Sequence, residues 1–323
     1  MTDIEDITKV LETAAKGRAS APRLKDGVLS LVLDVTGLSE MQREVIEAGI
    51  RGQMKSLDGI TDVRIAMTAE KKVVRLIAVG SGKGGVGKST LSANLAIALK
   101  RVGMKVGIVD ADIYGPSQPR LLGSEGTRPQ AEDKKLIPVP NAYGVPMLSM
   151  GQLAQPGQAI AWRGPMAGNA LGQLIDAHWG DIDVLIVDLP PGTGDVQLSM
   201  MQKHKPAGAI IVSTPQDLAL IDATRAVNLF EQADIPMIGL VENMAGYACP
   251  HCGEISDPFG TGGAEAAARQ MGMPFLGRIP LHIAIRTASD AGEPPAATDG
   301  EQGAPFMAIA EKVARWIENS RPR

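Results

Sequence analysis

Gly82-Lys83-Gly84-Gly85-Val86-Gly87-Lys88-Ser89-Thr90 is a glycine-rich segment that contains two lysines. Residues 82–89 match the phosphate-binding pattern G-x-x-x-x-G-K-[ST], directly after an apolar run at 73–79 and at the start of a helical pattern at 88–102. In this pattern, glycines let backbone N–H groups surround the β-phosphate, the lysine neutralises the β and γ oxygens, and the hydroxyl ligates Mg²⁺. We therefore expect residues 82–90 to bind ATP, with Lys88 on the phosphates and Ser89 on Mg²⁺.

A second phosphate-binding pattern overlaps the first one. Residues 80–85 also fit G-x-G-x-x-G, the dinucleotide fingerprint, and Asp110 at the end of the next apolar run would be the acceptor for a ribose hydroxyl. A dehydrogenase has no need for Lys88 and Ser89 at the start of the helix. The sequence therefore favours ATP over NAD.

Downstream of residue 73 the sequence alternates short β-branched runs with longer helical patterns. This alternation is typical of a mostly parallel sheet covered by helices on both faces. The expected strands are residues 73–79, 105–110, 145–150, 183–188, 208–213, 236–242 and 274–277. The expected helices are residues 88–102, 166–179, 196–204, 217–232 and 263–271. The sequence predicts an α/β P-loop NTPase domain at 71–323, with a surface excursion at 123–143.

The first 70 residues have a different organisation. Helical patterns at 4–16 and 40–57 flank an alternating strand at 28–35. We expect a small α+β domain at 1–70, ahead of the ATPase domain and joined to it by a polar linker at 68–72.

Polar side chains follow several of the expected strands, at the edge where α/β proteins bind their ligands. Asp188 ends the apolar run 184–187 and is placed like a carboxylate that holds Mg²⁺, directly or through a water. Asp112, two residues after Asp110, is the candidate for positioning the attacking water, although an aspartate here also fits a turn. Asn243 follows another strand, where its amide fits either the edge of a purine or a turn.

Cys249 and Cys252 are the two cysteines of the sequence. In a reducing compartment, their spacing is typical of a metal or redox pair rather than a structural disulfide. Thiolates bind zinc and iron–sulfur clusters, but either usually takes four ligands, so a homodimer would supply the other two. His251 is interpreted as an exposed loop residue, and a thioredoxin-like role is disfavoured because the pair does not open a helix. The residues alone leave zinc and an iron–sulfur cluster open.

Composition disfavours two classes of partner. The net charge of −4 and the pI near 5.7 argue against nucleic acid, whose binding leaves a basic footprint. No apolar run approaches the roughly 18 residues of a spanning helix, so we expect a cytoplasmic protein without stable membrane association. Residues 306–317 have one apolar face, and we expect it to pack on the sheet because the opposite face mixes both charges.

With these motifs located, the sequence resembles the Mrp/ApbC family of iron–sulfur cluster carrier ATPases, relatives of MinD, ParA and nitrogenase iron protein. The resemblance spans residues 73–295. It rests on the P-loop, with Lys83 as a second lysine, and on residues 110–117, Arg163-Gly164-Pro165, residues 188–195, and Asn243-Met244 with Cys249 and Cys252.

The resemblance implies a deviant Walker A ATPase that hydrolyses ATP slowly and in which Lys83 reaches the nucleotide of a partner subunit. It also implies a homodimer that bridges a [4Fe–4S] cluster through Cys249 and Cys252, and that receives clusters from scaffolds and passes them to apoproteins. The first 70 residues resemble a small iron–sulfur assembly domain but contain no cysteine, so partner docking is the role expected of them. The predicted catalytic residues are Lys83, Lys88, Asp112 and Asp188.

Two alternative functions stand beside the cluster carrier. A positioning ATPase of the MinD type, acting at a membrane or scaffold, would use the apolar face at 306–317. A zinc-binding nucleotide switch would share the fold and differ only in the ion at the cysteine pair.

Overall fold

A computed structural model of the chain describes residues 4–320 apart from 37, 39, 70–72, 154–163 and 250. The chain divides into two compact units, Met1–Val73 and Val74–Arg323. Most of the linker expected at 68–72 lies outside the described residues, as does Arg163. Each unit is described separately below.

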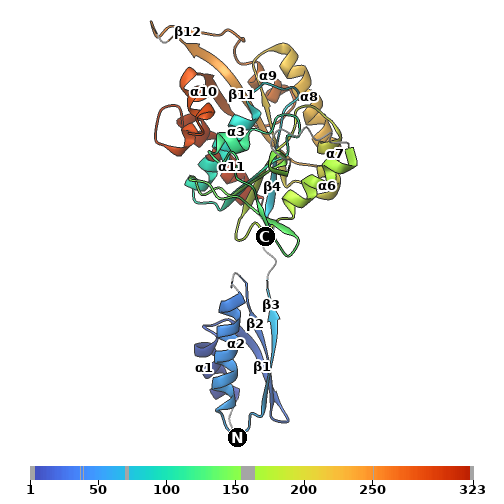
Figure 1. The fold of residues 1–323 in the computed structure, drawn as a ribbon, viewed down its shortest axis with the longest axis vertical. Helices are drawn as coiled ribbons and strands as arrows, with labels where there is room; N and C mark the ends of the chain where they lie inside the picture. The colour runs from blue at the N-terminus through green and yellow to red at the C-terminus, as the bar shows by residue number, and fades with distance from the viewer. Residues whose placement is uncertain are drawn as a thin grey trace. The chain divides into compact units, whose positions relative to one another are not determined.

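The N-terminal unit is a three-stranded sheet with two helices against it (Figure 1). Its elements are α1 (Ile4–Ala14), β1 (Ala19–Lys25), β2 (Val28–Asp34), α2 (Glu40–Lys55) and β3 (Asp62–Thr68). Strand β2 lies in the centre, antiparallel to β1 and parallel to β3. Its side chains alternate, so Leu29, Leu31 and Leu33 are buried against the helices. The two helices and β2 were predicted, whereas β1 and β3 were not.

The second unit contains an eight-stranded sheet in the order β12-β11-β10-β4-β9-β5-β8, with β13 also paired to β11. All of its strand pairs are parallel except β11 with β12. The strands are β4 (Arg75–Gly80), β5 (Val106–Asp110), β8 (Met147–Ser149), β9 (Val184–Asp188), β10 (Gly208–Ser213), β11 (Met237–Ala248), β12 (Ile255–Ser256) and β13 (Phe275–Leu281). This arrangement confirms the predicted mostly parallel α/β architecture.

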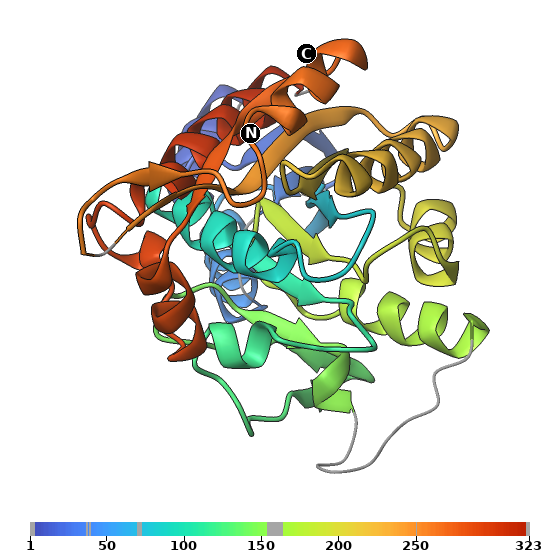
Figure 2. The same cartoon turned by 90° about the horizontal axis from the view of Figure 1, so that it is seen from above.

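Helices cover both faces of this sheet (Figure 2). They are α3 (Lys88–Arg101), α4 (Gln118–Leu121), α5 (Met150–Leu153), α6 (Gly164–Ile175), α7 (Asp195–Lys203), α8 (Asp217–Gln232), α9 (Gly263–Gln270), α10 (Ile283–Asp290) and α11 (Ala304–Asn319), with a short 3₁₀ helix, η1 (Pro295–Ala297). Helices α3 and α11 pack on one face with Ile77 and Val79 of β4, while α6 to α9 pack on the other with Ala78. Burial on both faces explains why these strands are continuous apolar runs.

Several elements differ from those expected from the sequence, among them α4, α5 and β12, which were not predicted. Strand β11 does not end at residue 242 but continues to Ala248, and β13 continues to Leu281. The excursion at 123–143 contains a small hairpin, β6 (Gln130–Glu132) with β7 (Lys135–Ile137). Helix α10 was not predicted.

The C-terminal helix α11 packs on the sheet, as predicted. Phe306, Ile309, Val313 and Ile317 are all buried in the core of the second unit. The apolar face that a membrane-surface role would require is therefore occupied by protein. Among the described residues, none of the helices combines the length and apolar character needed to cross a bilayer.

Candidate functional site

The predicted phosphate loop connects β4 to α3. Gly85 and Gly87 adopt φ of 78° and 82°, a left-handed conformation that glycine enters without steric cost. Gly87 caps α3 without a side-chain hydrogen bond, so the first N–H groups of the helix face the loop. A Cβ on Gly82 would overlap the backbone carbonyl of Asp222 in α8, so this position requires glycine. The loop has the backbone geometry of an anion cradle.

Lys88 and Asp188 form a buried ion pair behind this loop. The Lys88 Nζ lies 2.6 Å from Asp188 Oδ1, and the two side chains are 6% and 0% exposed. Asp188 also accepts hydrogen bonds from Ser92 Oγ at 3.0 Å and from Gln118 Nε2 at 2.8 Å. The Lys88 ammonium further donates to Ser89 Oγ at 3.3 Å. The structure thus brings Lys88, Ser89 and Asp188 together, as expected from the sequence.

Two more carboxylates lie close to this pair at the end of β5. Asp112 Oδ2 is 4.0 Å from Lys88 Nζ, while its Oδ1 accepts from the backbone N–H groups of Tyr114 and Gly115. Asp112 therefore forms the turn considered from the sequence and still faces the phosphate-binding lysine. Asp110 is fully buried and accepts from Gln118 N and Ser149 Oγ.

The electrostatics of this cluster favour an added cation. Burial, and then the charge of Asp188, raise the pKa of Asp110 from 3.8 to about 7. Lys88 forms ion pairs with Asp112 and Asp188, and its charge also acts on Asp110. No group of three or more His, Cys, Asp or Glu side chains is arranged to hold a metal ion in the described part of the chain. Mg²⁺ usually takes one or two protein ligands and completes its shell with phosphate and water.

Lys83 is held apart from Lys88. Its Nζ donates to Gln216 Oε1 at 3.2 Å, just before α8, and its side chain is half-buried. Because the Gln216 amide is neutral, this contact does not neutralise the charge of Lys83. The second lysine of the loop therefore contacts the residue that precedes α8.

Asn243 lies elsewhere than expected. It is inside β11 rather than at its end, so the turn interpretation is wrong. Its Nδ2 donates to the carbonyl of Val86 at 2.8 Å, and it stands directly against Gly87. The amide therefore fastens β11 to the phosphate loop.

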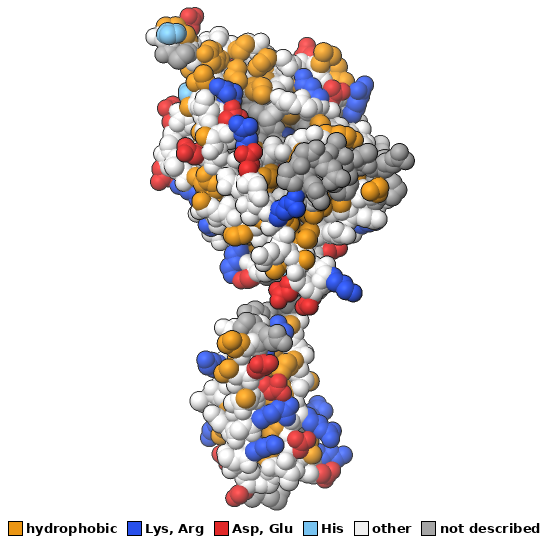
Figure 3. Space-filling view, in the orientation of Figure 1, with side chains coloured by type: hydrophobic (Ala, Val, Ile, Leu, Met, Phe, Trp, Pro, Cys, Tyr) orange, Lys and Arg blue, Asp and Glu red, His pale blue; other side chains and the backbone are white. Residues whose placement is uncertain are grey.

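The cysteine pair lies at the tip of the hairpin formed by β11 and β12, at the outer end of the sheet (Figure 1). Cys249 N donates to Glu254 O and Gly253 N donates to Cys249 O, both at 2.9 Å, which closes the hairpin. Both thiols are free; Cys252 is exposed and Cys249 is half-buried. The backbone N–H groups of Cys252 and His251, in that order, lower the pKa of Cys249. This end of the molecule also exposes apolar side chains, Ile255 among them (Figure 3).

The family model of the NUBPL iron-transfer P-loop NTPases, within the ParA group, matches residues 72–314 of this sequence. The chain belongs to this family. The match covers the second unit as far as residue 314 and includes only the last two residues of the N-terminal unit, whereas the resemblance noted from the sequence ended at residue 295.

Individual members of the family are closely similar to the chain. The iron–sulfur cluster carrier protein of Pseudomonas fragi is 48% identical over 244 residues, 75% of this chain and 84% of that protein. The iron–sulfur cluster transfer protein NUBPL of Dictyostelium discoideum is 42% identical over 271 residues, 82% of this chain and 84% of that protein. A nucleotide-binding protein of Archaeoglobus fulgidus, solved in complex with ADP, superimposes with a TM-score of 0.63 at 38% identity and covers 73% of this chain and 93% of that one.

Sequence reasoning missed three side chains of this family member's site: Ser92, Gln118 and Gln216. Ser92 follows Lys88 by one helical turn and bonds to its carbonyl, so helical spacing was a usable signal. Gln118 and Gln216 reach the site only through the tertiary fold, and no local pattern marks them.

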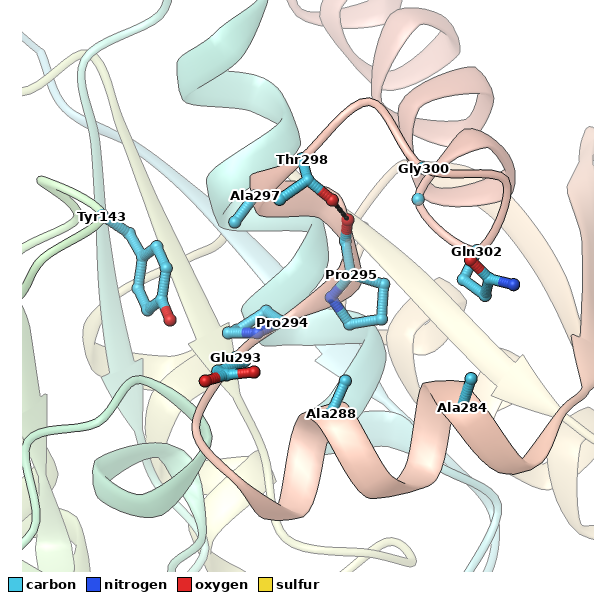
Figure 4. Close-up of a pocket in the computed structure, with 11 residues that line it drawn as sticks. Tyr143, Ala284, Ala288, Glu293, Pro294, Pro295, Ala297, Thr298, Gly300 and Gln302 are labelled. Atoms are coloured by element: carbon cyan, nitrogen blue, oxygen red, sulfur yellow. Dashed lines mark hydrogen bonds between the residues drawn. The ribbon is translucent and has the colours of Figure 1, made fainter.

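A cavity of about 350 Å³ lies away from this site, between α10, η1 and the loop before α11 (Figure 4). Three alanines and two prolines are among the 11 residues that line it, and Glu293 and Tyr143 are its ionisable groups. None of the phosphate-loop residues lines it. This cavity is therefore separate from the phosphate-loop site.

Proposed function

We propose that the chain is an ATP-hydrolysing carrier that binds iron–sulfur clusters and transfers them to apoproteins. One observation carries the proposal: strand β11 contacts the phosphate loop through Asn243 and runs on to Cys249 at its tip. The same strand thus joins a nucleotide site to a pair of soft-metal ligands. The names of the Pseudomonas and Dictyostelium relatives agree with this combination.

ATP is the nucleotide that the loop is built to hold. Residues 82–90 would wrap the β-phosphate with backbone N–H groups, and the Lys88 ammonium would exchange Asp188 for phosphate oxygens. Ser89 and Asp188 would hold Mg²⁺, which neutralises charge on the β and γ oxygens. Asp112, turned toward Lys88, would orient the attacking water, and Asn243 would stay on the loop rather than on the purine.

The cluster is cargo, and one chain supplies two of its ligands. A [4Fe–4S] cluster takes four thiolates, so the Cys249 and Cys252 pairs of two chains would share one cluster in a homodimer. The backbone N–H groups around Cys249 favour its thiolate, which is the form that binds iron. The exposed position of the hairpin tip suits a cluster that must be handed to another protein. In such a dimer, Lys83 would reach toward the partner's nucleotide.

Transfer to an apoprotein tests the carrier role directly. Anaerobically loaded protein, mixed with an apoprotein that needs a [4Fe–4S] cluster for activity, should restore that activity and lose its own iron absorption. The Cys249→Ala, Cys252→Ala double variant should restore none, while His251→Ala, in the same loop, should behave like the wild type. Equal transfer by the double variant would refute the proposal.

A zinc-bound nucleotide switch is the second candidate, because a tight hairpin with two thiolates also suits zinc. Metal analysis of protein purified without oxygen separates the two. Zinc at half an equivalent per chain, with no iron after reconstitution, would favour the switch.

A further inference from the structure

Gln118 is a buried polar residue that connects Asp110, Asp188 and the backbone of Ser89 in the nucleotide site. It begins α4, eight residues after Asp110, and is 0% exposed. Its backbone N–H donates to Asp110 Oδ2 at 3.0 Å. A glutamine is rarely buried so completely unless its amide has a definite task.

The amide nitrogen of Gln118 makes two hydrogen bonds. Nε2 donates to Asp188 Oδ2 at 2.8 Å and to the carbonyl oxygen of Ser89 at 3.0 Å. Both amide hydrogens are thus in use. The orientation of the amide is fixed, because a flip would place Oε1 against two acceptors.

The other end of the same amide has no partner. Gln118 Oε1 is buried and accepts no hydrogen bond; in the described part of the chain only Ser289 Oγ shares this condition. A buried acceptor without a donor is costly, and native proteins rarely leave one unpaired. Gln118 Oε1 can therefore accept a hydrogen bond from one more donor, next to Asp188 and Ser89.

A hydrated Mg²⁺ provides such a donor. Mg²⁺ dehydrates reluctantly and keeps several water ligands, whose O–H groups seek acceptors around the ion. Gln118 contacts Asp188 and Ser89, the two residues assigned above to this ion.

We propose that Gln118 is a positioning residue of the Mg²⁺–nucleotide centre. Its Nε2 holds the Asp188 carboxylate and the Ser89 backbone in place, and its Oε1 accepts a hydrogen bond from a water ligand of Mg²⁺. The inference rests on the proposed nucleotide function and extends it to a residue that no sequence motif marks.

A purely structural role for Gln118 makes a different prediction. If the amide only tied α4 to α3 and β9, its loss would weaken nucleotide binding equally with and without Mg²⁺. If it positions the hydrated ion, its loss weakens the Mg²⁺-dependent part alone. The Mg²⁺ dependence of nucleotide binding is therefore the discriminating readout.

The experiment titrates full-length protein with a fluorescent ADP derivative, in EDTA and across a range of free Mg²⁺. In Gln118→Met, which has similar length and no amide, the free Mg²⁺ for half-maximal binding should rise about 10-fold or more, the usual effect of losing an outer-shell partner. Binding in EDTA should not change. The control Ser289→Ala, which removes the other unpaired buried oxygen in α10, should match the wild type in both conditions.

Either an unchanged Mg²⁺ requirement in Gln118→Met or an equal loss of binding in EDTA would overturn the inference. Should circular dichroism show that Gln118→Met is unfolded, Gln118→Glu carries the test. Its added charge beside Asp188 should lower the Mg²⁺ requirement, and an unchanged requirement would contradict the proposal. A wild-type protein that binds no nucleotide would remove the proposed function together with the inference, whereas Mg²⁺-dependent wild-type binding with unaffected variants would remove the inference alone.

Discussion

Asp188 contacts three side chains from two helices: Lys88 and Ser92 from α3, and Gln118 from α4. The sequence predicted the lysine and the aspartate, because the P-loop pattern and a carboxylate after an apolar strand are local signals. It did not predict Gln118, because a glutamine after a turn is ordinarily exposed. Burial by the tertiary fold makes it part of the site.

Asp110 should make stability depend on pH in an unusual direction. Its pKa rises from 3.8 to about 7 in the folded protein, so the folded state binds its proton more tightly than the unfolded state. The stability that Asp110 contributes is complete below pH 3.8 and is lost as pH rises toward about 7. Relative to Asp110→Asn, the wild-type free energy of unfolding should fall between those values. Urea unfolding at several pH values measures this difference, and parallel pH profiles for the two proteins would contradict the assignment.

Adding one methyl group at residue 82 tests how closely the phosphate loop packs against α8. An added methyl group at residue 82 meets the backbone of Asp222, which can move only with α8. Gly82→Ala should lower the free energy of unfolding by about 1–3 kcal/mol or more, the usual cost of overpacking.

Gly84→Ala is the matched variant for this measurement. A Cβ at residue 84 makes only an ordinary contact with Pro191, 3.8 Å away. Its free energy of unfolding should remain close to that of the wild type. Equal destabilisation by both alanines would show that flexibility of the loop, and not its contact with α8, is what glycine provides.

Among the elements of the second unit, strand β11 connects the phosphate loop to the cysteine pair. The sequence suggested that it ends at residue 242, because Asn243 is typical of turns. In the structure Met244 and Gly246 do adopt left-handed φ of 61° and 70°, and pairing with β13 shifts register between Asn243 and Tyr247. The chain nevertheless continues as a strand to Ala248. Strand β13 pairs with β11 on both sides of this irregularity, and β12 pairs with β11 beyond it. Because of this pairing, the turn-forming residues make the strand irregular but do not end it.

Asn243→Ala should weaken the effect that nucleotide binding has on the cysteines. It removes the Asn243–Val86 hydrogen bond and leaves the hairpin tip intact. In the wild type, ATP should change the rate at which Cys249 and Cys252 react with a thiol reagent, because loop and hairpin share β11. In the variant, that change should be smaller while reconstituted iron content is unaffected. An ATP effect of full size in the variant would show that the coupling runs elsewhere.

For the whole molecule, the sequence predicted the elements that are marked by apolar runs or by the phosphate-loop motif. Strands β4, β9 and β10 are buried on both faces, so their runs are unmistakable. Strand β1 of the N-terminal unit contains Pro22 and is largely exposed, so it carries no such signal. Strand β3 is also exposed at most of its positions, so it too lacks an apolar run that would predict it.

The N-terminal unit has a core of its own and no cysteine, so cluster binding must be assigned to the second unit. Its boundary near residue 73 agrees with the start of the family match at residue 72. Docking of partners remains the proposed role of this unit.

If two chains share one cluster through four thiolates, native mass spectrometry of anaerobically reconstituted protein should detect two 33.9 kDa chains with one [4Fe–4S] cluster. The Cys249→Ala, Cys252→Ala variant should lack this species. A species with one chain and its own metal, or a dimer without iron, would contradict this prediction.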